Sequence, residues 1–269
     1  MRILLVAPKQ VDNVGDFYFF PLGIAYISAA LKKAKFDVEC LNLNHTGEPI
    51  DEVIRREIFS KDIDIVGTSC LPGDYNKVKH ILATAKQVKK NIISIAGGGL
   101  ITSEPELMLK ALSVDVAVLG EGEETIVELV RAIENDDDLK NIKGIMYKDR
   151  SANIVATPPR GVIENLDSLP FPDYDGFEIE KFLDYQRSSD DSFLYPFDKP
   201  RYIPMGASRS CPFNCTFCYH SLGKKYRQRS LDSFFEEVRF CVKEYGINIV
   251  FLIDELFAMD ERRLNEFCD

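Results

Sequence analysis

The chain has 269 residues, 45% of them hydrophobic, and can therefore bury a core large enough for one large domain or two modest ones. A formal charge of −10 argues against a nucleic-acid-binding protein, because phosphate recognition needs a clustered basic surface. The first apolar run, residues 3–7, is shorter than a secretory signal and far shorter than the ~20 residues that cross a bilayer, so we expect a cytoplasmic protein without membrane contact.

Residues 1–140 alternate short apolar runs with helical periodicity, which is typical of a parallel sheet covered on both faces. The apolar runs predict five strands, at 3–7, 38–43, 63–68, 92–96 and 114–119. The periodic segments predict four helices, at 22–33, 51–60, 75–89 and 123–134. We expect a doubly wound, Rossmann-like α/β domain.

Three loops at the carboxyl ends of these strands are candidates for ligand binding, because ligands of such sheets bind at that edge. Glycine permits a positive φ and lets a large flat ligand approach the backbone closely. A single glycine triplet is weak evidence, since tight turns also use glycine, but three such loops favour a bound ligand. The candidate residues are Ser69 and Leu71 after the third strand, Gly97, Gly98 and Gly99 after the fourth, and Gly120, Glu121 and Gly122 after the fifth.

The composition changes after this domain. Residues 143–147 and 153–157 predict a hairpin. Seven of the thirteen prolines, Pro196 among them, fall between 158 and 204, where they exclude a central strand or a long helix. We therefore divide the chain into a front domain at 1–140, a hairpin and proline-rich connector at 141–200, and a second domain at 201–269.

The second domain reads as strand, loop, helix, strand and helix. The strands are expected at 202–207 and 247–253, the first helix at 231–244 with Ser230 as its cap, and the last helix after Asp260. A complete (β/α) barrel needs ~250 residues, so two such units would form only the truncated start of a barrel.

The loop of this domain contains three cysteines, Cys211, Cys215 and Cys218, in the spacing CxxxCxxC. Three thiolates can hold a metal centre and leave one position open, whereas a structural zinc site takes four ligands. Zinc with His220 as fourth ligand is the alternative. The following segment, residues 224–229, has four basic residues and is either a solvated loop or a holder of a small anion.

This spacing, with an aromatic residue before the third cysteine and a strand before the loop, resembles the radical S-adenosylmethionine (radical SAM) superfamily. The resemblance implies that the three cysteines bind a 4Fe-4S cluster and that the open iron chelates SAM. It further implies that one electron, supplied by a flavodoxin or ferredoxin, cleaves SAM to a 5′-deoxyadenosyl radical that attacks a small-molecule substrate. Phe217 and Tyr219 would shield the cluster or contact SAM, and Asp254 and Glu255 would bind the SAM amino group; two exposed carboxylates at a strand end are the alternative for this pair.

The front domain is similar to the cobalamin-binding class of that superfamily. The similarity rests on residues 20–28, 64–67, 97–99, 120–123 and 169–173, the last reading Leu-Pro-Phe-Pro-Asp. Ser69 to Leu71 matches the SxL motif of cobalamin-binding modules and Gly97-Gly98 matches their GG motif, whereas DxHxxG is absent, because neither His45 nor His80 follows an aspartate at that spacing. The resemblance implies a cobalt without a histidine ligand, and a cobalamin nucleotide tail near Ser69 and residues 97–99.

Enzymes of this class often methylate unactivated carbon or phosphorus, and others, such as the anaerobic cyclase of chlorophyll synthesis, form rings. A non-catalytic cobalamin or iron-sulfur module is a further alternative. A methylthiotransferase would need three more ligating cysteines in the front domain, where only Cys40 and Cys70 occur; these two and Cys241 are expected to be buried filler. Because an open two-unit barrel cannot exclude water, we expect weak or undetectable SAM cleavage by this chain.

Overall fold

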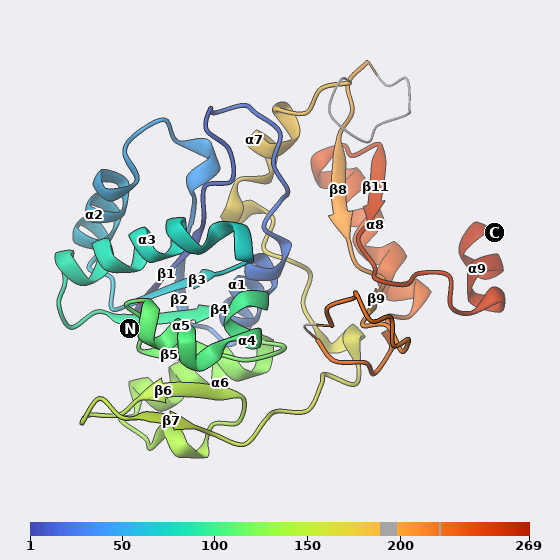
Figure 1. The fold of residues 1–269 in the computed structure, drawn as a ribbon. Coiled ribbons are helices and arrows are strands. Elements are labelled where there is room, and N and C mark those ends of the chain that lie inside the picture. The colour runs from blue at the N-terminus through green and yellow to red at the C-terminus, as the bar shows by residue number, and fades with distance from the viewer. Residues whose placement is uncertain (189–197, 221) are drawn as a thin grey trace. The chain divides into compact units, whose positions relative to one another are not determined.

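The computed structural model describes residues 1–188, 198–220 and 222–269 (Figure 1). Pro196 of the expected connector lies outside the described residues. The chain forms two compact units, the first made of residues 1–161 and 172–179, and the second of residues 162–171 and 180–269. The proline-rich connector is therefore divided between the two units.

A seven-stranded sheet is the centre of the first unit, with the strand order β2-β1-β3-β4-β5-β6-β7. The first five strands are parallel, and β6 and β7 are the expected hairpin, which continues the same sheet in antiparallel pairing. Their bounds are β1 (Arg2–Ala7), β2 (Asp37–Asn42), β3 (Ile65–Ser69), β4 (Ile93–Gly97), β5 (Val116–Val118), β6 (Ile145–Lys148) and β7 (Ile154–Ala156). All five predicted parallel strands form, each within about two residues of its expected bounds.

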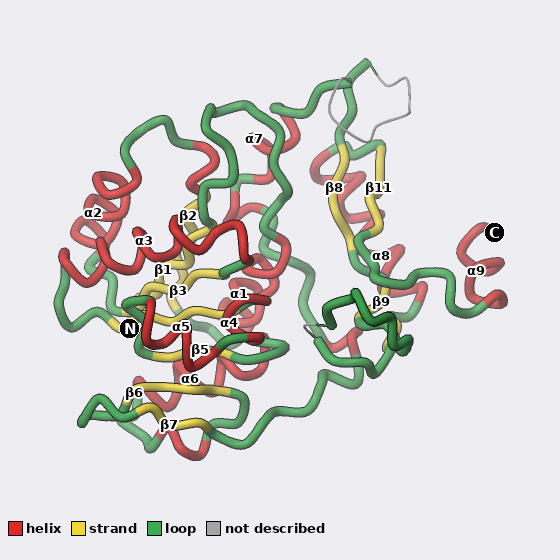
Figure 2. Tube along the Cα trace, viewed as in Figure 1, coloured by secondary structure: helices red, strands yellow, loops and turns green. Residues whose placement is uncertain are grey.

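Helices cover both faces of this sheet (Figure 2), which confirms the doubly wound architecture. On one face, alternate strand residues such as Leu4, Val6 and Val66 pack with buried side chains of α2, α3 and α5. On the other face, α1 packs beside α6. The bounds are α1 (Leu22–Lys33), α2 (Ile50–Lys61), α3 (Tyr75–Val88), α4 (Gly99–Ser103), α5 (Pro105–Ala111) and α6 (Glu123–Glu134), with 3-10 turns η1 (Leu43–His45), η2 (Pro72–Asp74), η3 (Leu139–Asn141) and η5 (Asp175–Phe177).

The segment 172–179 is attached to the first unit through a buried carboxylate. Asp173 ends the Leu-Pro-Phe-Pro-Asp sequence, and its side chain is 12% exposed. It pairs with Lys32 at 2.6 Å and accepts a hydrogen bond from the Ser28 hydroxyl at 2.5 Å, both on α1. The Asp173 backbone N–H donates to the carbonyl of Ala25. Although burial favours the neutral acid, the Lys32 and Ser28 hydrogen bonds prevail and lower the Asp173 pKa.

The second unit contains the predicted β-α-β-α run. β8 (Tyr202–Met205) and β11 (Ile249–Leu252) pair in parallel, and α8 (Leu231–Tyr245) connects them. Ser230 caps α8 by accepting from the Ser233 N–H, as predicted, and Asp260 caps α9 (Glu261–Cys268). The other elements are η4 (Leu166–Ser168), α7 (Ile179–Asp184), and the two-residue strands β9 (Ser208–Arg209) and β10 (Arg227–Gln228).

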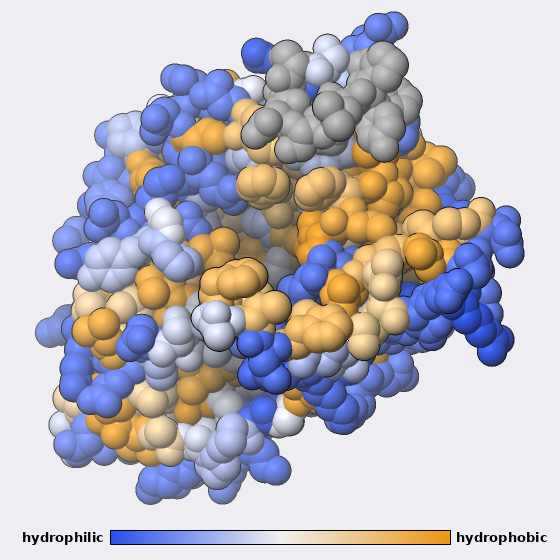
Figure 3. Space-filling view, turned by 45° about the vertical axis from the view of Figure 1, so that its right-hand side comes forward, coloured by the Kyte–Doolittle hydropathy of each residue, from blue (hydrophilic) through white to orange (hydrophobic). Residues whose placement is uncertain are grey.

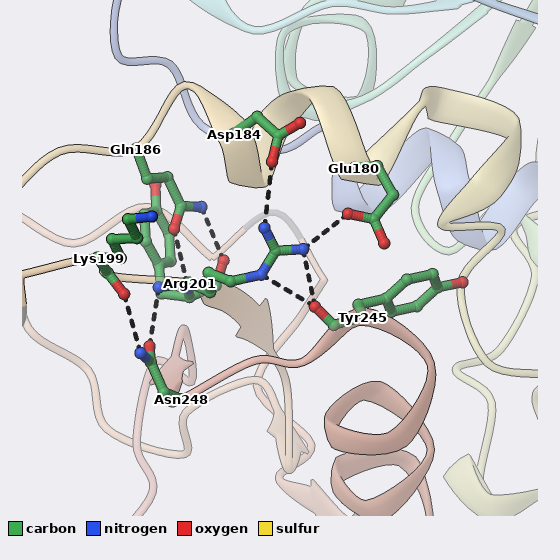
Figure 4. A network of polar contacts seen from close by, with 8 residues as sticks. Glu180, Asp184, Gln186, Lys199, Arg201, Tyr245 and Asn248 are labelled. Carbon is green, nitrogen blue, oxygen red and sulfur yellow. Dashed lines mark hydrogen bonds and ion pairs between the residues drawn. The ribbon is translucent and has the colours of Figure 1, made fainter.

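Arg201 joins four segments of the second unit at the start of β8 (Figure 4). Its guanidinium pairs with Glu180 and Asp184 of α7 and donates to the Tyr245 carbonyl at the end of α8. Its backbone N–H donates to the Asn248 side chain just before β11. A guanidinium can serve several acceptors at once because its donors lie in one plane, so Arg201 fixes the amino-terminal ends of β8 and β11 together.

Apolar side chains gather on the surface of the second unit (Figure 3). All four residues of β11 are apolar and only half-buried, whereas β8 is fully buried. Within residues 1–188, 198–220 and 222–269, none of the helices has the length and apolarity needed to cross a bilayer.

Candidate functional site

The loops after β3 and β4 are hydrogen-bonded to each other at the carboxyl edge of the first unit's sheet. The Cys70 N–H donates to the Gly97 carbonyl, and the Leu100 N–H donates to the Cys70 carbonyl. Gly98 has φ +94, and a Cβ there would lie 2.8 Å from the Ser69 hydroxyl oxygen and 2.9 Å from the Cys70 carbonyl oxygen. This position therefore requires glycine, both for its backbone angle and for the space between the two loops.

The loop after β5 is joined to the same edge by a side chain that the sequence did not single out. Thr102 of α4 accepts a hydrogen bond from the Gly120 N–H at 3.1 Å. Gly120 has φ +71 and open space around its Cα, while Glu121 is buried. Because β3, β4 and β5 are neighbours, the structure brings Ser69, residues 97–99 and Gly120 to one edge, as predicted.

Two of the candidates in these loops have different surroundings. A Cβ on Gly122 would lie 2.9 Å from Ile27 of α1, so this glycine permits α6 to pack against α1. Leu71 is 56% exposed and directly precedes the turn η2. The candidate ligand surface is therefore built mainly from backbone, with Ser69 and Thr102 as its polar side chains, and it suits a large flat ligand whose contacts are to main-chain groups.

Neither histidine of the first unit lies in the loops after β3, β4 and β5. His45 is buried in η1, where Nε2 pairs with the Tyr18 hydroxyl at 2.7 Å and Nδ1 with Glu178 at 2.9 Å. His80 is exposed on α3. Asn42 also donates to the Tyr18 hydroxyl, so the His45 ring has a structural role between η1 and the segment 172–179.

The three cysteines of the second unit lie on one loop between β9 and β10. Cys211 is half-buried, Cys215 and Cys218 are exposed, and none of them forms a disulfide. A turn, in which the Cys218 N–H donates to the Cys215 carbonyl, brings two of the ligands toward one another. Phe217 is 90% exposed and Tyr219 is 56% exposed.

Among the described residues, no three His, Cys, Asp or Glu side chains lie close enough together to hold a metal ion. The donor set nevertheless fits an iron-sulfur cluster, because three unpaired thiols stand on one short exposed loop.

A two-residue antiparallel ladder closes the base of this loop. Arg227 pairs with Arg209, and Gln228 with Ser208. Neither strand was expected from the sequence, since each has only two residues. Between them the chain starts the loop at Ser210, which is buried and has φ +66, an uncommon angle for a residue other than glycine.

The basic segment 224–229 is neither a solvated loop throughout nor a free anion site. Arg227 and Arg229 are buried, and Arg229 forms an ion pair with the buried Glu237 of α8. Lys225 is exposed and pairs with Glu164 at 2.5 Å, and Lys224 donates to Asn214. The two arginines are two residues apart along β10 and the residue after it, so both side chains lie on the same face and are buried in the second unit.

Asp254 and Glu255 follow β11 but differ in their surroundings. Asp254 accepts hydrogen bonds from the Ala207 N–H at 3.1 Å and from the Ser208 hydroxyl, so it fixes the turn between β8 and β9. Glu255 lies 3.7 Å from Nδ1 of His220. His220 is largely buried, and neither of its ring nitrogens has a hydrogen-bond partner among the described residues. Glu255 and His220 are therefore the pair with capacity for a ligand.

The remaining cysteines of the core are poor metal ligands. Burial raises the pKa of the Cys40 thiol to about 12 and that of Cys70 to about 11, so both remain protonated at neutral pH. Cys70 and Cys241 are buried filler, as expected. Cys40 is only half-buried and contacts the Ser28 hydroxyl and Asp173, so its surroundings are more polar than the sequence indicated.

Known proteins are similar in sequence to this chain over nearly its whole length. Residues 11–130 match the family model of the B12 binding domain, which identifies the first unit as a cobalamin-binding type of α/β domain. The chain is 32% identical, over 98% of its length and 55% of the relative's, to an uncharacterized methyltransferase of Pyrococcus horikoshii. It is 28% identical, over all of its length and 48% of the relative's, to the anaerobic magnesium-protoporphyrin IX monomethyl ester cyclase of Rubrivivax gelatinosus.

Its fold is also that of the radical S-adenosylmethionine methyltransferase TsrM from Kitasatospora setae, solved with cobalamin and a [4Fe-4S] cluster bound. The TM-score is 0.75 and the identity 18%, over 99% of this chain and 50% of that one. Residues 11–130 thus match the B12 binding domain, and the fold of the whole chain matches that of a radical SAM enzyme solved with cobalamin bound. The chain spans about half the length of the curated relatives it matches.

Proposed function

We propose that the chain provides the cofactor-binding part of a cobalamin-dependent radical SAM enzyme that transfers a methyl group to an unactivated position of a small molecule. The observation that carries the proposal is the presence, in one chain, of a B12-binding domain and a CxxxCxxC loop placed after the first strand of a β-α-β-α unit. When bound, the cluster and SAM supply a carbon-centred radical, and cobalamin supplies a methyl carrier.

Cys211, Cys215 and Cys218 are the proposed cluster ligands, with Phe217 and Tyr219 as exposed aromatic cover that becomes buried against the cluster or SAM. Of the two acidic residues after β11, Glu255 is the better candidate for the SAM amino group, because Asp254 already accepts two hydrogen bonds from the turn after β8. β8, α8, β11 and α9 are proposed to be part of a (β/α) barrel, in which the half-buried apolar β11 pairs further. A flavodoxin or ferredoxin is the proposed electron donor.

In the first unit, the proposed cobalamin surface consists of Ser69, residues 97–99 and Gly120, with Leu71 as an exposed apolar neighbour. The bonded loops fix the backbone before the ligand arrives, so little ordering entropy is lost on binding. Glu121 and Gly122 support this surface through burial and helix packing. No histidine is proposed for the lower face of cobalt, because both ring nitrogens of His45 are engaged by Tyr18 and Glu178.

The test is anaerobic iron-sulfur reconstitution of the chain, followed by electron paramagnetic resonance with and without SAM. The proposal expects a cluster signal whose shape changes when SAM is added. Cobalamin binding, followed by absorbance, should occur in the same preparation. Zinc in place of iron, or a cluster signal that is indifferent to SAM, would reject the radical SAM assignment.

A cyclase-type reaction is the second candidate, supported by the 28% identity to the Rubrivivax gelatinosus cyclase. The two candidates differ in what happens to SAM. Methyl transfer consumes the methyl group of SAM, so label from methyl-labelled SAM should appear on the bound cobalamin. Cobalamin that remains unlabelled while 5′-deoxyadenosine forms would favour the cyclase-type reaction, and binding of both cofactors without any turnover would favour a non-catalytic module.

A further inference from the structure

Arg227 is a buried cation directly beneath the cysteine loop. It is 6% exposed and donates to three acceptors that lie far apart in the sequence. Nη1 donates to the Ile163 carbonyl at 2.8 Å, Nε to the Lys225 carbonyl at 3.0 Å, and Nη2 to the Ser210 hydroxyl at 3.1 Å. Because the guanidinium stays charged at any ordinary pH and its donors have fixed directions, these three groups are held in one geometry.

Ser210 connects this cation to the loop. It immediately precedes Cys211, is 1% exposed, and has φ +66. Its hydroxyl accepts from Arg227 and donates to the Leu222 carbonyl at 3.1 Å, near the other end of the loop. A residue other than glycine keeps a positive φ only where its surroundings determine it, and here the buried hydrogen bonds do so.

We propose that Arg227 and Ser210 form a clasp that holds the two ends of the cysteine loop together before the cluster binds, so that the residue preceding Cys211 is already fixed when the three thiols converge. The role of the clasp in cluster binding rests on the proposed function, whereas the clasp itself rests only on the hydrogen bonds of Arg227 and Ser210. Arg227 is a positioning residue, since it acts on the cluster through Ser210. The clasp acts on the loop backbone, so the three thiols need to rearrange only within a loop whose ends are already fixed.

The neighbouring basic residues give matched controls. Lys225 is two residues away but exposed, and pairs only at the surface with Glu164. Ser210→Ala removes the hydroxyl while keeping the same backbone preference, and Arg227→Met removes the charge and all three donors while keeping most of the side-chain volume. Arg227→Lys keeps the charge but cannot reach three acceptors.

The first measurement is hydrogen exchange of the loop amides in the full chain without cluster. Arg227→Met and Ser210→Ala should raise exchange about tenfold or more for residues 210–220 and 222–226, the factor that corresponds to ~1.4 kcal/mol of lost local stability, while α8 amides keep their protection. Lys225→Met should leave the loop unchanged, and Arg227→Lys should fall between. Unchanged loop exchange in Arg227→Met overturns the clasp, whether or not the chain binds a cluster, and so does a uniform increase that includes α8.

The second measurement is the rate at which a chelator removes iron from reconstituted protein, together with the urea midpoint of the cluster-free chain. The clasp predicts faster iron loss in Arg227→Met, about tenfold by the same conversion, at a urea midpoint close to that of the wild type. A loss rate equal to that of the wild type, or one explained by a lower urea midpoint, overturns it. Failure of the wild-type chain to take up a cluster would reject the proposed function instead, and the exchange data would still decide the clasp.

Discussion

The two candidate cofactor sites are built from different parts of the polypeptide. In the first unit the loops after β3, β4 and β5 present backbone to the ligand, and hydrogen bonds between the loops hold that backbone in place. In the second unit three thiols stand on an exposed loop, and only the base of the loop is fixed, by β9, β10, Arg227 and Ser210. A backbone surface is formed as soon as the sheet folds, whereas the thiols of a metal site take up their final positions only when the metal or cluster binds. The two sites should therefore fail in different ways.

Loss of one cysteine should have the largest effect and should be confined to the second unit. Cys215→Ala leaves two thiols for the cluster, so we expect reconstituted iron to fall to background, because short-spaced ligands cannot be replaced by the exposed Cys268. Cobalamin binding should not change. Iron and sulfide analysis and cobalamin absorbance measure the two outcomes. Cys268→Ala is the matched control, and a Cys215→Ala chain with full iron content would contradict the assignment of the ligands.

Filling the space at Gly98 should damage the first unit instead. In Gly98→Ala the new Cβ meets Ser69 and Cys70 and occupies a backbone angle unfavourable to alanine, which together should cost about 3 kcal/mol. We expect a lower urea midpoint and at least about tenfold weaker cobalamin binding, with cluster content retained. Gly73→Ala, in the turn η2 of the same edge with open space around it, serves as the control. Equal affinity of Gly98→Ala and wild type for cobalamin would place the ligand elsewhere.

The two acidic residues after β11 should separate binding from stability. Glu255→Gln should weaken SAM about tenfold, since a hydrogen bond to a charged group contributes about 1.5–3 kcal/mol, and leave the urea midpoint unchanged. Asp254→Asn should lower the urea midpoint, because it disturbs the hydrogen bonds to Ala207 and Ser208. SAM titration of the cluster signal and urea unfolding are the measurements. Weaker SAM binding in Asp254→Asn together with a lower urea midpoint in Glu255→Gln would contradict the roles assigned to these two residues.

Local sequence patterns predicted much of this molecule and missed what depends on distant partners. The helices at 22–33 and 123–134 were predicted to the residue, because their apolar faces span these residues and Pro21 and Gly122 directly precede them. The three candidate loops lie at one edge of the sheet, as the order of the parallel strands predicted. By contrast, β9 and β10 are too short to carry a periodic pattern, and the partners of Arg227 include Ile163, 64 residues away. The alternation of Arg227 and Arg229 was the available signal, since period-two charges on a strand can point inward together.

The smallest effect we expect concerns Asp173, whose partners on α1 were equally remote in sequence. Asp173→Asn removes the ion pair with Lys32 and should lower the free energy of unfolding by about 1–2 kcal/mol, toward the low end because Lys32 is partly exposed. The pKa of Asp173 is lowered in the folded chain, so its contribution is complete above the unfolded value, near 3.8, and disappears as the pH falls through the folded value.

The difference in unfolding free energy between wild type and Asp173→Asn should therefore be constant from neutral pH down to about pH 4 and should shrink below it. Urea unfolding at several pH values measures this difference, and Asp12→Asn, at an exposed position before α1, is the comparison. Cobalamin and cluster binding should both survive in Asp173→Asn, because the carboxylate touches neither proposed site. A difference that grows as the pH falls would show that the carboxyl is neutral in the folded chain and that Lys32 does not determine its charge.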